Sequence, residues 1–229
     1  MPEIPAKYGR FKDAPWFNTS GEEINVLIGG AGGIGSHLAF LLTRAGFIPF
    51  VYDFDIYEAH NMSGQLCKTT DIGKAKVIAL QDSIKLLCDT EITIFNETYT
   101  EDSPTHNYVF SGFDNMKARK IMYESWRKQF KGDKNAIFID GRLSFEMFQI
   151  YCVTGDRADE YEKTLFDDSE VQDDVCTLKQ TTHIAAMIAA YMTSFFTNHI
   201  TNVNTETQDR NVPFYWEYFS PAGIISTEE

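Results

Sequence analysis

Residues 24–55 read INVLIGGAGGIGSHLAFLLTRAGFIPFVYDFD, and this stretch decides the fold. The apolar run over 24–30 ends in glycine, which is typical of a buried strand. Apolar residues at helical spacing follow over 32–46 and stop at Gly46, and a second apolar run covers 47–55. A strand, a glycine turn, a helix and a strand within about 30 residues predict a βαβ unit.

The rest of the chain continues this alternation of strands and helices. We therefore predict an α/β fold: a Rossmann-like doubly wound, mostly parallel sheet with helices on both faces and C-terminal antiparallel strands. The apolar helix near the C-terminus is expected in the core or against a second subunit. The expected elements are helices over 74–88, 115–130 and 183–200, strands over 92–100, 108–113, 136–142 and 148–155, and a terminal pair of strands within 211–227.

Length and patterning indicate one sizeable domain over 24–229, preceded by an irregular arm over 1–23 that contains at most a short helical turn. Residues 156–175 are acidic and nearly free of aliphatic side chains, so we expect a solvated crossover loop there. The sequence contains no uninterrupted apolar run of about 18 residues, so it does not predict a transmembrane helix. The N-terminus also lacks the apolar core of a secretory signal.

Charge and cysteine usage narrow the function classes. The net charge is −13 at pH 7, which argues against binding to nucleic acid or to anionic membrane surfaces. The four cysteines are widely spaced and include no C-x-x-C pair, so a four-cysteine zinc site is excluded. Scattered cysteines without a leader are typical of reduced thiols in a cytoplasmic protein.

The glycine loop is the first functional signal. Gly30, Gly32, Gly33 and Gly35 lie in a stretch that fits G-x-G-x-x-G, directly after a strand and at the start of a helix. Glycines permit a tight turn and a close approach of the backbone to a pyrophosphate, which the free N–H groups of the helix start can bind. No G-K-S/T follows, so this is not a Walker A loop. By itself the loop is compatible with NAD, FAD, a methyl donor or ATP.

Two acids end the second strand, Asp53 and Asp55. In Rossmann domains an acid at this position accepts hydrogen bonds from the ribose hydroxyls, which is the role we predict for Asp53. Strand alternation points Asp53 and Asp55 the same way. Asp55 is therefore expected either to contact the ligand or to order the loop that follows.

Further motifs make the chain resemble the ThiF, MoeB and HesA family of ubiquitin-activating-enzyme-like adenylyltransferases. The resemblance extends from about residue 24 to 155. The family pattern D-x-D…N-L-x-R-Q…G-x-x-K is similar to Asp53-Phe54-Asp55, Asn61, Gln65 and Gly73-Lys74-Ala75-Lys76. The pattern D-N-x-x-x-R resembles residues 113–119. The pattern G-x-x-G-Q-I/V resembles Gly141-Arg142 together with residues 148–150.

The resemblance implies a fold, an activity and partners. The fold would be a mostly parallel sheet in a homodimer. The reaction would join the C-terminal carboxylate of a ubiquitin-like or sulfur-carrier protein, or of a peptide, to AMP from ATP, with release of pyrophosphate. ATP and Mg²⁺ are the cofactors that this reaction implies.

Individual residues inherit roles only where they match a family motif. Lys76 is similar to the lysine that touches the nucleotide phosphates, and Lys74 is expected to be a bystander. Asp114 is similar to the aspartate that holds Mg²⁺, and it is also a candidate N-cap of the next helix. Asn61 and Gln65 would contact or order the nucleotide site.

The chain also departs from the family. The arginine of N-L-x-R-Q falls on Gly64, and Lys68 and Arg142 are candidates for a replacement cation. Cys176 precedes the apolar helix and is a candidate for a thioester-forming catalytic residue. A helix N-terminus would lower the pKa of its thiol, whereas the acids at 173 and 174 would raise it.

Two other functions stay open from the sequence. An NAD-dependent oxidoreductase would share the glycine loop, although the Tyr8-x-x-x-Lys12 pair precedes that loop and is misplaced for a dehydrogenase dyad. A non-catalytic nucleotide-binding protein is the second alternative, because Gly64 replaces a phosphate-binding arginine. All three functional interpretations share one expectation about position. We expect four features just past strand ends, where the carboxyl ends of parallel strands share one crevice: the glycine loop, Asp53, Asp114 and Arg142.

Overall fold

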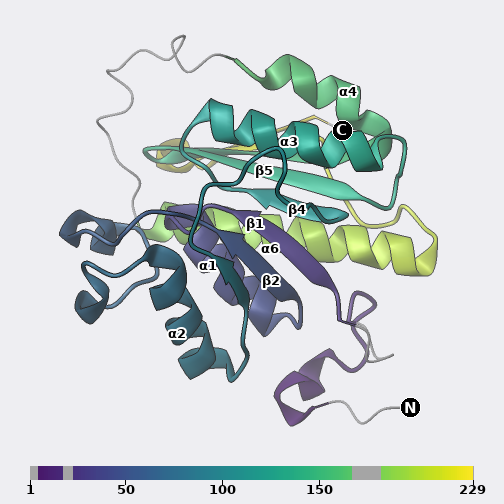
Figure 1. Ribbon diagram of the computed structural model, residues 1–229. Helices are drawn as coiled ribbons and strands as arrows, with labels where there is room; N and C mark the ends of the chain where they lie inside the picture. Colours follow the sequence, from purple (N-terminus) through teal and green to yellow (C-terminus); the bar gives the residue numbers. More distant parts are fainter. Residues whose placement is uncertain (1–4, 18–22, 167–181, 229) are drawn as a thin grey trace.

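A computed structural model describes residues 5–17, 23–166 and 182–228 (Figure 1). One sheet runs through the molecule in the order β3-β2-β1-β4-β5-β6-β7-β8. Its first five strands are parallel, and β6, β7 and β8 add as antiparallel neighbours. The strands are β1 Asn25–Gly29, β2 Ile48–Tyr52, β3 Thr93–Phe95, β4 Tyr108–Ser111, β5 Ile137–Ser144, β6 Met147–Thr154, β7 Tyr215–Phe219 and β8 Ile224–Glu228. The predicted fold class is confirmed.

Helices cover both faces of the sheet (Figure 1). On one face lie α1 Gly33–Arg44, α2 Lys76–Cys88 and α6 Thr182–Thr205, and on the other lie α3 Met116–Phe130 and α4 Ala158–Tyr161. Alternation along β1 explains the division, because Val26 and Ile28 pack in the core under α1 and α6 while Leu27 packs in the core under α3. Short 3₁₀ turns occupy Ala6–Phe11, Ala59–Ser63, Thr69–Asp71, Gly155–Arg157, Glu162–Thr164 and Ser220–Ala222.

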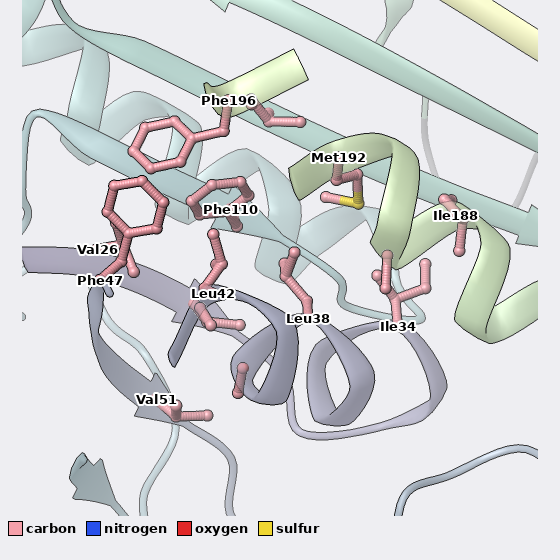
Figure 2. Close-up of a cluster of buried hydrophobic side chains, with 14 of the residues drawn as sticks. Val26, Ile34, Leu38, Leu42, Phe47, Val51, Phe110, Ile188, Met192 and Phe196 are labelled. Atoms are coloured by element: carbon pink, nitrogen blue, oxygen red, sulfur yellow. The ribbon is translucent and has the colours of Figure 1, made fainter. Parts of the chain in front are cut away.

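The larger core lies where α1 packs along α6 above the central strands (Figure 2). Leu38 and Leu42 of α1 face Met192 and Phe196 of α6 over Phe110 of β4, and all five side chains are buried. The apolar helix expected near the C-terminus therefore belongs to the core of its own chain. Within the described ranges, none of the helices is both long enough and apolar enough to cross a membrane.

The predicted solvated loop over 156–175 is wrong for the part that the structure describes, residues 156–166. This part forms helical turns, in which Ala158 and Tyr161 are buried against α3. The acids between them point outward, and Asp159 pairs with Arg127 of α3 and with Lys131, which follows that helix. The acidic composition of the whole segment did not predict these turns. Two buried residues three positions apart are enough to pack one helical turn against the core.

The site is positioned by the sheet order. The order reverses between β1 and β4, and in an open α/β sheet ligands bind at this switch point, outside the carboxyl ends of the strands. The segments that leave β1, β2 and β4 at that edge carry the glycine loop, Asp53 and Asp114. These three expectations for strand ends are confirmed.

Candidate functional site

The glycine loop opens α1 with free backbone donors. Ser36 N donates to Gly32 O (3.0 Å) as the first helical hydrogen bond, which leaves the N–H groups of the first turn without intrahelical partners. Gly30 has a φ of +90°, and a Cβ at Gly35 would lie 1.7 Å from Gly30 O, so the turn itself requires these two glycines. A Cβ at Gly32 would meet no atom of the described residues within 4 Å. The backbone at Gly32 is therefore open to a ligand.

Asp53 ties this loop to the end of β2. Its Oδ2 accepts from Ala31 N (2.7 Å) and its Oδ1 accepts from Asp55 N (2.8 Å). Burial raises the pKa of Asp53, and the hydrogen bonds from these two amides oppose that shift. Each carboxylate oxygen has a second lone pair, so the side chain can still accept from a ribose hydroxyl.

Lys76 lies at the start of α2 in contact with Asp55. Its Nζ is 2.8 Å from Asp55 Oδ2, and its side chain is only 10% exposed. Backbone hydrogen bonds join the same segments, from Lys76 N to Asp55 O and from Tyr57 N to Lys74 O (both 2.9 Å), around the Ile56–Ala75 bridge. The structure thus gives Asp55 a loop-ordering contact and holds a buried ammonium beside the glycine loop.

The loop after β2 is fastened to the first turn of α1. Asn61 Oδ1 accepts from Glu58 N (2.8 Å), which closes the turn, and Leu66 N donates to Ser36 Oγ (2.9 Å). Gln65 Oε1 is buried and has no hydrogen-bond partner among the described residues. An unsatisfied buried acceptor costs free energy, so this amide is available to a bound polar group.

Asp114 lies exposed in the loop between β4 and α3. The predicted N-cap role falls instead on its neighbour, because Asn115 Oδ1 accepts from Ala118 N (2.8 Å). Asn115 Nδ2 also donates to Asp114 Oδ1 (3.2 Å). Among the described residues no group of three or more His, Cys, Asp or Glu side chains is arranged to hold a metal ion. A single exposed carboxylate nevertheless fits Mg²⁺, which proteins often bind through one or two carboxylates together with water and phosphate oxygens.

Arg142 is not where the sequence predicted. It lies inside β5, which continues to Ser144 because it pairs with β6 through a tight hairpin. Its Nε donates to Asp140 Oδ2 (2.7 Å), its Nη atoms donate to Thr164, and the guanidinium lies 4.4 Å from the centre of the Tyr151 ring. These contacts use its hydrogen bonds within the fold, so Arg142 is not a free cation for a phosphate.

Sequence reasoning missed the role of Asp140. This carboxylate is fully buried and accepts from Arg119, Arg142 and the Tyr161 hydroxyl. Burial acts to raise its pKa, but the two arginines outweigh burial and hold the pKa below its ordinary value. Arg119 also donates to Phe113 O, next to Asp114. An acid inside the apolar run AIFIDGR was the sequence signal of a buried ion pair.

A match to a family model now decides the classification. Residues 20–221 match the model described as the ThiF family. The chain belongs to the ThiF family. The resemblance drawn from the motifs is confirmed over most of the chain.

Solved structures share the fold of this ThiF-family chain. PaaA superposes with a TM-score of 0.66 at 17% identity, E. coli MccB with ATP with a TM-score of 0.64 at 14% identity, and MccB in complex with N-formylated MccA with a TM-score of 0.65 at 17% identity. Each match covers 90% of this chain and 64% of the other. At such low identity these likenesses establish the fold. No curated protein matches the chain in sequence.

Two further features of this ThiF-family chain are a cysteine and a cavity. Cys176 falls outside the described residues, so its predicted role stays a prediction from sequence. A cavity of about 620 Å³, lined by Asn135, Thr154, His199 and other residues, opens at the amino end of β5. That end is opposite to the glycine loop, so this cavity is separate from the candidate site.

Proposed function

We propose that this protein is an ATP-dependent adenylyltransferase that activates the C-terminal carboxylate of a peptide, or of a ubiquitin-like or sulfur-carrier protein. One observation carries the proposal: the glycine loop, Asp53 and Lys76 come together at the carboxyl ends of β1 and β2. Membership of the ThiF family supports it. The similar protein MccB has been solved with ATP and with the partner MccA, which favours ATP and a peptide substrate.

The reaction needs little acid–base chemistry from the protein. An ionised substrate carboxylate attacks the α-phosphorus of ATP, an O–P bond forms, and the bond to pyrophosphate breaks with the electron pair leaving on its oxygen. The amides of the α1 start bind phosphate oxygens, and Lys76 exchanges Asp55 for the charge that develops on the leaving group. Catalysis then comes from positioning and charge stabilisation, with no obligatory general base.

Asp114 would hold Mg²⁺ beside these groups. When bound, the ion supplies neutralisation of phosphate charge and polarisation of a phosphoryl oxygen. We also propose a homodimer, as the family resemblance implies, in the cytoplasm, which the scattered cysteines favour, with a single catalytic domain over 24–229. Asp53 would orient the ribose, and Asn61 and Gln65 would keep the nucleotide loop in place.

A thermal-shift titration tests the nucleotide. ATP with Mg²⁺ should raise the unfolding temperature, since a ligand at a hundred times its Kd stabilises the native state by about 2.7 kcal/mol. The Lys76→Ala variant should lose most of this shift, whereas Lys85→Ala, which alters an exposed pair with Glu91 at the far end of α2, should keep it. Stabilisation by NAD⁺ and not by ATP would overturn the proposal in favour of a dehydrogenase.

Pyrophosphate exchange separates an enzyme from a nucleotide-binding protein without activity. Candidate peptides with a free C-terminal carboxylate should drive exchange of labelled pyrophosphate into ATP in the wild type. The Asp114→Ala variant should lose metal-dependent exchange while keeping its fold, because Asp114 is exposed. Exchange that is unchanged in this variant would rule out the metal role of Asp114.

A further inference from the structure

The proposed site holds more acids than cations. Among the described residues, Asp53, Asp55 and Asp114 lie around it, and the Lys76 ammonium contacts Asp55. Asp55 already balances the charge of Lys76 at 2.8 Å. A triphosphate would add further negative charge, and like charges at short distance repel strongly at the edge of a protein. Mg²⁺ held by Asp114 would offset part of this repulsion, and further positive charge beside the loop amides and Lys76 would offset more of it.

Such charge lies in the loop that precedes Lys76. Asp71 is fully buried, and its Oδ1 lies 3.2 Å from Lys74 Nζ and 3.8 Å from Lys68 Nζ. Its Oδ2 accepts from Lys68 N (3.0 Å), which fixes the turn. One carboxylate balances one lysine, so this group of three side chains carries one positive charge in excess.

Backbone contacts attach the segment that carries both lysines to the candidate site. Leu66 N, two residues before Lys68, donates to Ser36 Oγ in the first turn of α1. Lys74 O accepts from Tyr57 N in the loop after β2, and Lys74 lies two residues before Lys76, which contacts Asp55.

Both lysines can bind a phosphate while they stay in contact with Asp71. Their side chains are 46% and 45% exposed, whereas Asp71 is fully buried, and each ammonium has three N–H donors. The arginines near the site differ, because buried Arg119 and the 12% exposed Arg142 are both bound to Asp140. A phosphate can therefore accept from the remaining donors of the lysines, whereas the arginines are held by the fold.

We propose that Lys68 and Lys74, gathered on Asp71, form a second polyphosphate contact that binds the part of ATP released as pyrophosphate. This inference rests on the proposed function and extends it to two residues that the motif comparison left as a bystander and a candidate. The two lysines contact the triphosphate of ATP but do not reach the single phosphate of AMP, which is bound only by the loop amides and Lys76. They therefore set the preference of the site for ATP over AMP.

Calorimetric titration of the full chain with ATP and with AMP tests the inference. Lys68→Gln and Lys74→Gln should each weaken ATP about three- to tenfold, as expected for one charge-assisted contact, and the double variant should weaken it further. The Kd for AMP should stay unchanged in all three. Lys85→Gln is the matched control, since Lys85 is a 52% exposed lysine that pairs with Glu91, and it should leave both constants unchanged.

The outcomes distinguish this inference from the proposed function. If ATP and AMP weaken in parallel, or if neither changes in the lysine variants, the polyphosphate contact is wrong and ATP-dependent adenylation stands. If the wild type binds no ATP, the proposed function fails and this inference fails with it. A lower unfolding temperature without ligand, with an unchanged ratio of the ATP and AMP constants, would show that the lysines only neutralise Asp71.

Discussion

At the scale of single residues, the charged side chains near the site have two different tasks. Arg119 and Asp140 are buried, and both Arg119 and the 12% exposed Arg142 bind Asp140, so these side chains hold β5 to the start of α3. Lys76 is buried too, but its contact with Asp55, a half-exposed acid, leaves it able to meet a ligand. Burial of both partners, rather than charge, separates structural from functional groups here.

The first prediction concerns the buried ion pairs. Arg119→Ala should lower the free energy of unfolding by about 3–5 kcal/mol, because it removes one partner of a buried charge. Urea denaturation measures the loss, and Lys85→Ala should change stability by about 0.5 kcal/mol or less. A loss for Arg119→Ala as small as that of the control would mean that Arg142 alone compensates Asp140.

Two glycines of the loop provide a matched comparison. Gly35→Ala should destabilise the fold by about 3 kcal/mol, because the new Cβ would overlap Gly30 O. Gly32→Ala should cost about 1 kcal/mol or less, since it changes only an N-cap with open space around it, but it should weaken ATP. Urea denaturation and ATP titration check both variants. The reverse order of stability would contradict the assignment of Gly35 to the turn and Gly32 to the ligand.

Cys176 can be tested separately from adenylation. If it forms a thioester, Cys176→Ser should keep pyrophosphate exchange and lose only a conjugate that is cleaved by added thiol. Mass spectrometry of the chain after reaction with ATP and a candidate substrate measures this conjugate. The same thiol-resistant products from both proteins would remove Cys176 from the mechanism.

At the scale of elements, α6 shows how polar side chains fix the ends of an apolar helix. The helix packs on α1, and its last turns contain buried His199 and Asn202. His199 Nε2 lies 2.9 Å from Asn135 O, and Asn202 exchanges two hydrogen bonds with the backbone of Arg210. These contacts explain why the helix extends to Thr205, beyond the end predicted at 200.

The histidine in this helix predicts a pH dependence. Burial lowers the pKa of His199 from its ordinary 6.5, and the hydrogen bond to Asn135 only partly opposes the shift. Below about pH 6.5 the unfolded chain binds a proton that the native state resists, so stability should fall as the pH decreases.

The His199→Gln variant should lose less of its unfolding temperature between pH 7.5 and 5.5 than the wild type, because glutamine keeps a donor for Asn135 and does not titrate. Part of the slope should remain, since burial also lowers the pKa of His37 and His106. His183→Gln, an exposed position of the same helix, is the control and should keep the wild-type slope. Equal slopes in all three proteins would contradict the assignment.

At the scale of the whole molecule, the sheet has two parts with different tasks. The parallel strands β1 to β5 present the site at their carboxyl ends, and the antiparallel strands β6 to β8 extend the sheet beyond it. Trp216 of β7 is buried and packs on Tyr191 of α6, with ring centres 4.2 Å apart. All five residues of β8 are exposed.

This difference predicts how the C-terminal part contributes to stability. A chain that ends after Gly223 should lose only about 1–2 kcal/mol and keep one cooperative transition, because β8 buries no side chain. Trp216→Ala should lose about 3–5 kcal/mol through a cavity between the sheet and α6. Urea denaturation ranks the two variants, and a larger loss for the truncated chain would make β8 an integral part of the core.

The sequence by itself determined the βαβ unit, the order of the strands and of the longer helices, and the positions of the glycine loop, Asp53 and Asp114 at strand ends. These features follow from local periodicity and from glycine turns, which are properties of neighbouring residues. Only the tertiary structure decided that Arg142 binds Asp140 and Thr164, that Tyr161 anchors residues 156–166, and that Asp71 gathers two lysines beside Lys76. Most of these outcomes depend on contacts between segments far apart in the chain, and all depend on how deeply each side chain is buried, which the spacing of residue types does not encode.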